Sequence, residues 1–307
     1  MAPAMQRVDL IRRRPYPSAV HRHTWQPRVT SKPKTKGEDS LWVEQVGDGP
    51  VVATAIHAGH EVRRDLLPLL AIDEATRTRE EDPYTDALVK VVPSWIVFKR
   101  SRFEVDLNRP REEAVYLEPE MAWGLQVWKQ PPGAREIERS LEEYDRFYDE
   151  LYQLLKKIER RHRCFVVFDL HSYNYRRRGP HEPPEPPQVA PDVNVGTGSL
   201  DRRRCGPIVE RFMRDLRDYD FLGHHLDVRE NVKFKGRHLA QWIHSRFPDS
   251  ACVLAIEFKK FFMDEWTGVA DIDQVEEIRK ALHATLPGIL EELQKIPQCR
   301  DDGHGRD

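Results

Sequence analysis

Short, unbroken apolar runs mark the central part of the chain. They show no alternation of apolar and polar residues, and they cover residues 51–56, 95–98, 164–170 and 252–256. Runs of this kind are typical of strands that are covered on both faces, as in the sheet of an α/β protein. We therefore predict four buried strands.

Between these runs, apolar residues recur at spacings of three and four. This periodicity predicts long amphipathic helices over about 136–161 and 271–293, and shorter helices over 207–218 and 237–246. Strands that alternate with helices predict an α/β fold of three layers, with helices on both sides of a central mixed, mostly parallel sheet.

The two ends of the chain differ from this pattern. Residues 1–40 carry nine Lys and Arg residues and recurring prolines but no apolar periodicity, and residues 296–307 are polar. Such composition cannot bury enough apolar surface to form a core. We expect a basic tail over 1–40, one catalytic domain over 41–295 and a frayed tail over 296–307. The alternative for the basic tail is an electrostatic arm for a partner.

An arginine-rich and proline-rich segment interrupts the domain. Arginine triplets at 176–178 and 202–204 flank the prolines of 181–187. A loop of this length directly after a strand is usually functional or disordered. We expect residues 174–204 to form a loop insert, either solvated or binding acidic ligands.

Charge and cysteine content exclude several classes of protein. The 49 Lys and Arg residues against 51 Asp and Glu residues give a net charge of -2, which makes a nucleic-acid partner improbable. No apolar run is long enough to span a membrane, and the first thirty residues contain no apolar core of a signal peptide. The four cysteines form no CxxC pair, so we expect no disulfide framework and a reducing, cytoplasmic setting.

Three of the four predicted strands end in ionisable residues, namely His57, His171 and Glu257. Because the carboxyl ends of strands are where α/β sheets bind ligands, these residues predict a metal site or an acid–base site. The spacing leaves the third ligand open. Glu61 lies four residues beyond His57, and Asp82 precedes a proline, where it could equally be a helix N-cap.

A cluster of charged residues follows the strand at 95–98. Arg102 and Arg109 could form a fork around a substrate carboxylate, with Asn108 as a further donor. The alternative is a surface group of ion pairs with Glu104 and Asp106. Spacing alone does not separate these two interpretations.

Five motifs in order carry a family resemblance. They are His57-Ala58-Gly59, Asp82 to Asp86, Ser101 to Arg109, Asp169-Leu170-His171-Ser172, and Glu257 with Met263-Asp264-Glu265. Over about residues 50–290 the chain resembles the N-formylglutamate amidohydrolase family, of the zinc carboxypeptidase-like superfamily. Five motifs in order are far more specific than any one of them.

The resemblance implies a carboxypeptidase-like fold and a single zinc ion. Carried over residue by residue, it makes His57, His171 and Asp82 the zinc ligands, with Glu61 as the rival of Asp82. It makes Glu257 the general base, and it matches Arg102, Asn108 and Arg109 to the positions that bind the substrate carboxylate. The chemistry of amide hydrolysis adds a second role, since Arg102 or the metal would stabilise the oxyanion.

A loop at 231–237 also resembles the family, with one departure. Arg237 stands where the family has glycine, and Lys235 lies two residues earlier. We expect both side chains to contact substrate, with Arg237 narrowing or recharging the pocket.

Together these features predict a zinc-dependent amidohydrolase that cleaves an N-formyl or N-acyl amino acid, a small amide that bears a carboxylate. One alternative is a zinc carboxypeptidase that acts on short peptides. The other is a binding module that uses the arginine-rich tail and loop.

Overall fold

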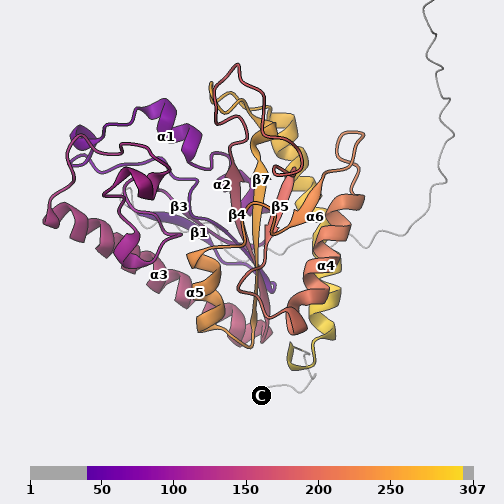
Figure 1. The fold of residues 1–307 in the computed structure, drawn as a ribbon. Coiled ribbons are helices and arrows are strands. Elements are labelled where there is room, and N and C mark those ends of the chain that lie inside the picture. Colours follow the sequence, from indigo (N-terminus) through magenta and orange to yellow (C-terminus); the bar gives the residue numbers. More distant parts are fainter. Residues whose placement is uncertain (1–39, 300–307) are drawn as a thin grey trace, which may run out of the picture.

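A seven-stranded mixed sheet forms the centre of the protein (Figure 1). The structure is a computed structural model and describes residues 40–299. Along the sheet the strands follow the order β1-β3-β2-β4-β7-β5-β6. Their bounds are β1 Trp42–Gln45, β2 Val51–Ala55, β3 Ser94–Phe98, β4 Phe165–Tyr173, β5 Val193–Gly196, β6 Val228–Glu230 and β7 Ala251–Lys259.

The four strands predicted from apolar runs are four adjacent inner strands of this sheet. β3, β2, β4 and β7 lie side by side and pair in parallel. Every residue of β2, β3 and β4 is buried, as an unbroken apolar run requires. β1 pairs antiparallel with β3, β5 pairs antiparallel with β7, and β6 completes the sheet in parallel with β5. These three strands are too short to give an apolar run that sequence could identify.

Helices cover both faces of the sheet (Figure 1). α3 (Ala134–His162) and α5 (His238–Arg246) pack on one face, and α4 (Arg202–Asp218) and α6 (Ile272–Lys295) pack on the other. The predicted three-layer α/β/α fold is confirmed. Two short helices, α1 (Glu74–Glu80) and α2 (Thr85–Leu88), lie near the carboxyl ends of the strands. The 3-10 helices are Leu67–Leu69, Val89–Val91, Arg111–Glu113, Pro119–Ala122, Lys260–Phe262 and Pro297–Cys299.

Each helical layer has its own apolar core against the sheet. On one side Phe147 and Leu151 of α3 pack in the same cluster as Phe165 of β4. On the other side Phe212 of α4 and Leu282 of α6 share a cluster with the sheet. The stripes at spacings of three and four are therefore the buried faces of these helices.

The arginine-rich segment is more ordered than a loop insert. Strand β5 and the first turn of α4 both lie within 174–204, so only the part before β5 and the short connection between β5 and α4 are irregular. The second arginine triplet begins α4, where Asp201 caps the helix by accepting a hydrogen bond from the backbone of Arg203. This segment is ordered by the pairing of β5 with its neighbouring strands. The local amino-acid composition gives no sign of that pairing.

A disulfide joins Cys164 to Cys299, with their Cα atoms 5.2 Å apart. The expectation that the cysteines form no disulfide is wrong for this pair. β4 begins and α6 ends at the same end of the sheet, and a sequence separation of 135 residues gives no sign of that proximity. The cysteine pattern therefore no longer indicates a reducing compartment, since structural disulfides persist where conditions are oxidising.

The same bond corrects the predicted C-terminal tail. Residues 296–299 are not frayed, because they contain a 3-10 helix and the bonded Cys299. The remainder of that tail, 300–307, and residues 1–39 of the basic tail lie outside the described residues.

Replacing Cys299 by serine is expected to lower the free energy of unfolding by about 2–5 kcal/mol, because the bond closes a long loop of the unfolded chain. Urea unfolding of the oxidised protein measures this. Wild-type protein unfolded with a reductant is the control and should match the variant. Equal stability of oxidised wild type and variant would contradict a stabilising disulfide.

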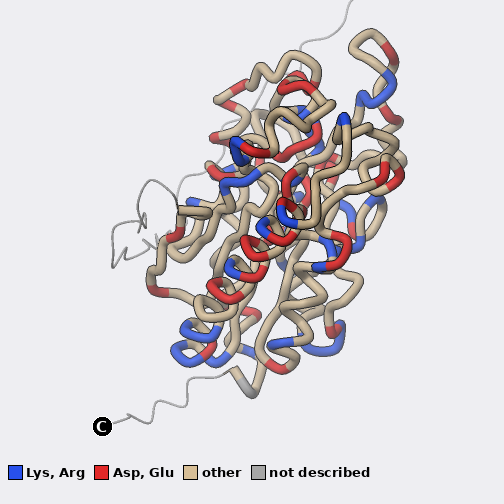
Figure 2. The backbone as a smooth tube through the Cα atoms, turned by 90° about the vertical axis from the view of Figure 1, so that its left-hand side faces the viewer, with Lys and Arg blue, Asp and Glu red and all other residues tan. Residues whose placement is uncertain are grey.

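Acidic and basic residues are interspersed over the side of the molecule seen in Figure 2, which shows no large area of one sign there. Within residues 40–299, no helix combines the length and the apolar character that crossing a membrane requires.

Candidate active site

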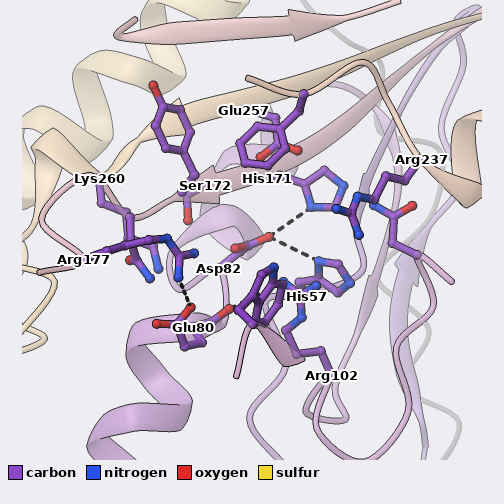
Figure 3. A pocket seen from close by; sticks show the side chains of 15 residues that line it. His57, Glu80, Asp82, Arg102, His171, Ser172, Arg177, Arg237, Glu257 and Lys260 are labelled. Carbon is purple, nitrogen blue, oxygen red and sulfur yellow. Dashed lines mark hydrogen bonds and ion pairs between the residues drawn. The ribbon is translucent and has the colours of Figure 1, made fainter. Parts of the chain in front are cut away.

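The sheet brings the three predicted strand-end residues together. His171 on β4 and Glu257 on β7 are register partners on adjacent parallel strands. His57 follows β2, the other neighbour of β4, and its ring centroid lies 5.0 Å from that of His171. Both histidines are only 2% exposed. Figure 3 shows them facing one cavity together with Glu257.

Asp82 completes a group that could hold a metal ion. One of its carboxylate oxygens, Oδ2, lies 3.0 Å from Nδ1 of His171 and 3.4 Å from Nδ1 of His57 (Figure 3). One potential ligand atom from each of the three residues lies within 4.8 Å of the others. Asp82 belongs to the turn between α1 and α2, and its backbone N–H donates to the carbonyl of His57. Its side chain therefore does not cap α2, which has Tyr84 at its N-cap.

Carboxylates hold the far nitrogens of both histidines. Nε2 of His57 lies 2.6 Å from Asp106, and Nε2 of His171 lies 3.1 Å from Asp169. Such partners fix the orientation of metal-binding imidazoles. Sequence analysis did not give Asp106 and Asp169 this role. For Asp169 a signal existed, since it stands two residues before His171 on the same strand and so on the same face.

The polar atoms of the group fit a bound cation. Nδ1 of His57 is buried and has no hydrogen-bond partner within residues 40–299. Burial alone would raise the pKa of Asp82, but the imidazole nitrogens of His171 and His57, at 3.0 Å and 3.4 Å, hold it below its usual value. A carboxylate that stays ionised beside two imidazole nitrogens is a donor set that zinc and other transition metals accept.

Glu61 lies away from this group. Its side chain is 51% exposed and pairs with Lys99 at 3.2 Å and Arg100 at 3.3 Å. The chain beyond Gly59 pairs with the segment after β3, since Glu61 and Arg100 form a parallel bridge. The structure therefore brings Asp82, and not Glu61, to the two histidines.

Glu257 lines the cavity. Within residues 40–299, no basic side chain forms a salt bridge with its carboxylate. Burial raises its pKa to about 7, against the opposing effect of His171. A carboxyl group whose pKa is close to neutral pH can both accept and return a proton, as a general base requires.

This raised pKa predicts a pH-dependent stability effect. The folded protein binds the Glu257 proton more tightly than the unfolded chain, so the destabilisation is absent below about pH 4.5, grows with pH and is complete above about pH 7. In chelator-treated protein, Glu257→Gln is therefore expected to be more stable than wild type by roughly 1–3 kcal/mol at pH 8, and by less at pH 5. Urea unfolding at both pH values measures the difference. A constant difference would contradict a titrating Glu257.

The predicted substrate-binding residues separate into two groups. Arg102, Asn108 and Arg237 line the cavity, whereas Arg109 and Lys235 do not. Arg109 donates to the carbonyl of Met121 at 2.9 Å and stacks over a tyrosine ring. Lys235 is exposed.

The three cavity residues differ in how they are held. Arg102 binds Asp106 at 2.9 Å, so it touches the carboxylate that orients His57. Asn108 accepts a hydrogen bond from the backbone of Leu239, next to the loop of Arg237. No ion pair engages Arg237 within residues 40–299, and its side chain is exposed toward the cavity.

The cavity is also lined by residues that sequence analysis did not select as site residues, among them Glu80, Trp123, Arg177 and Lys260. Arg177 comes from the first arginine triplet and binds Glu80 at 3.1 Å (Figure 3). Its guanidinium also lies 5.8 Å from the centre of the Trp123 ring. The arginine-rich segment thus forms part of the cavity wall. The cavity itself is small, at about 70 Å³.

Known proteins share this fold. Residues 49–262 match the family described as N-formylglutamate amidohydrolase. The crystal structure of N-formylglutamate amidohydrolase from Ralstonia eutropha JMP134 is 19% identical and has a TM-score of 0.64, over 83% of this chain and 98% of that one. A gene product of Agrobacterium tumefaciens is 17% identical with a TM-score of 0.58, over 80% of this chain and 92% of that one. A search of the curated proteins found no match.

The fold and the family match define the class of protein, a hydrolase that acts on amide bonds. More particularly, the chain belongs to the N-formylglutamate amidohydrolase family, as the match over most of its length shows. The resemblance drawn from the five motifs is confirmed.

Proposed function

We propose that the protein is a zinc-dependent amidohydrolase that cleaves an N-formyl or N-acyl amino acid. The observation that carries this proposal is the convergence of His57, His171 and Asp82 on one point, beside a buried strand-end glutamate in the same cavity. A metal site with an adjacent base is what hydrolysis of an unactivated amide needs.

The side chains divide the chemistry between them. His57, His171 and Asp82 would hold the zinc ion, which when bound lowers the pKa of water and polarises the scissile carbonyl. Glu257 takes the proton of the attacking water and delivers it to the leaving nitrogen. Arg102, at the cavity wall, stabilises the negative charge that develops on the carbonyl oxygen.

The geometry favours Arg237 over Arg109 as the cation that binds the substrate carboxylate. Arg237 lines the cavity and has no ion pair in the described chain, whereas Arg109 is hydrogen-bonded to Met121 outside the cavity. Asn108 lies at the cavity wall beside Arg237 and adds a directional donor. We therefore assign the carboxylate to Asn108 and Arg237, and Arg109 and Lys235 remain sequence-based predictions.

Replacing Arg237 by alanine is expected to raise KM for carboxylate substrates by roughly 10–150-fold, because a charge-assisted hydrogen bond contributes about 1.5–3 kcal/mol. The kcat should change little. Arg109→Ala is the matched control and should leave KM within a few-fold of wild type. Steady-state kinetics on the same substrate measure both. The reverse order of effects would return the carboxylate to Arg109.

The size of the cavity favours a small substrate over a peptide. Its volume of about 70 Å³ is well below the ~300–1,000 Å³ of typical ligand sites. A binding module would have no use for Glu257 beside the metal group.

Metal analysis and a substrate screen test the proposal together. We expect one zinc ion per chain, and hydrolysis of N-formyl or short N-acyl amino acids that a chelator abolishes and added zinc restores. Release of C-terminal residues from peptides at a higher kcat/KM would favour the carboxypeptidase. A zinc-free protein without amidase activity would contradict the proposal.

A further inference from the structure

A buried lysine lies across the cavity from the two histidines. Lys260 begins the 3-10 helix that follows β7, three residues beyond Glu257. It is only 1% exposed and lines the cavity (Figure 3). A charged side chain in such a place is costly unless its N–H groups are hydrogen-bonded. The chemistry proposed above gives this residue no role.

The hydrogen bonds of Lys260 identify what it does. Its Nζ donates to the carbonyl of Arg79 at 2.5 Å and to the carbonyl of Glu81 at 2.7 Å. These carbonyls belong to the end of α1 and to the residue directly before Asp82. One ammonium group thus fixes the backbone that leads into the carboxylate of the metal group.

The other side of the same backbone is also held. The side chain of Glu81 forms hydrogen bonds with Ser101 and His60. Arg77 of α1 in turn donates to His60. Hydrogen bonds therefore connect the segment before Asp82 to Ser101, which follows β3, and to Lys260, which follows β7.

Asp82 needs such restraints because the sheet does not set its position. His171 and Glu257 are placed by the sheet, since they are register partners on adjacent strands. Asp82 belongs to a turn between two short helices, so no strand pairing sets its distance from the histidines. Its own backbone N–H, bonded to the carbonyl of His57, is one restraint, and Lys260 supplies two more.

We propose that Lys260 is a positioning residue, which ties the turn of Asp82 to the strand of Glu257 and so keeps the third metal ligand in place. The inference rests on the metal site of the proposed function. Lysine suits the task because its ammonium has three donors and no acceptor.

Lys260→Met is the direct test, and the neighbouring residue offers a matched control. Lys259 belongs to the same segment but pairs with Asp192 at 2.6 Å, away from the turn of Asp82. We expect Lys260→Met to weaken zinc binding by about 10–100-fold in competition with a chromophoric chelator, as loss of an outer partner of a metal site does. Lys259→Met should bind zinc as wild type does.

Hydrogen exchange of the metal-free proteins gives a second readout, independent of zinc and of activity. The peptide that contains residues 79–84 should exchange faster in Lys260→Met than in wild type or in Lys259→Met, because the turn loses two restraints. Peptides from β4 should be unchanged. If Lys260→Met does not fold, Lys260→Gln, which retains an N–H donor, undergoes the same two measurements.

The outcomes separate this inference from the proposed function. Wild-type zinc affinity and unchanged exchange of the 79–84 peptide in the Lys260 variant would overturn the positioning role. A wild-type protein that takes up no zinc would overturn the proposed function instead, and the exchange comparison would then decide the role of Lys260 alone.

Discussion

Replacing Glu257 by glutamine is expected to lower kcat by about 10²–10⁴-fold and to leave KM near its wild-type value. Glutamine keeps the shape of the side chain but cannot accept the proton of the attacking water. Since that proton moves in the transition state and not in the bound complex, substrate binding should persist. Steady-state kinetics on an N-formyl amino acid, with zinc content measured for each protein, give the result.

A purely structural role for Glu257 predicts the opposite. If the glutamate only balanced a buried cation such as Lys260, the variant would lose stability and keep its activity. Since Lys260 is bonded to backbone carbonyls and burial raises the pKa of Glu257, we expect a variant that is stable and inactive. A stable variant with normal turnover would remove Glu257 from the mechanism.

Replacing Asp82 by alanine is expected to abolish tight zinc binding and, with it, nearly all activity. The variant removes one of the three side chains that converge on the metal position. Removing a residue that only hydrogen-bonds to a metal ligand lowers metal affinity by about 10–100-fold. Removing the ligand Asp82 should lower zinc affinity by more than this. Metal analysis after gel filtration and a chelator-competition titration measure it.

Glu61→Ala is the matched control for this experiment. Both residues are acidic and both were candidates for the third ligand, but Glu61 is half exposed and paired with Lys99 and Arg100. Its variant should keep wild-type zinc content and activity. Zinc loss in Glu61→Ala with retention in Asp82→Ala would contradict Asp82 as the third ligand and favour Glu61.

The sequence by itself determined the inner sheet, the covering helices and the family. A short unbroken apolar run is typical of a strand buried on both faces, and a stripe at spacings of three and four is typical of a helix with one buried face. His57, His171 and Glu257 were identified because the predicted strands end in them, and the carboxyl ends of parallel strands meet at one edge of the sheet.

Tertiary structure decided what depends on contacts between distant segments. The short strands β1, β5 and β6 exist through their pairing with longer neighbours, and the Cys164–Cys299 bond exists because two distant chain segments end at the same place. The choice of Asp82 over Glu61 has the same origin. Both carboxylates are close to His57 or to a helix start in sequence, but only the packing of the α1–α2 turn, restrained by Lys260, brings one of them to the histidines.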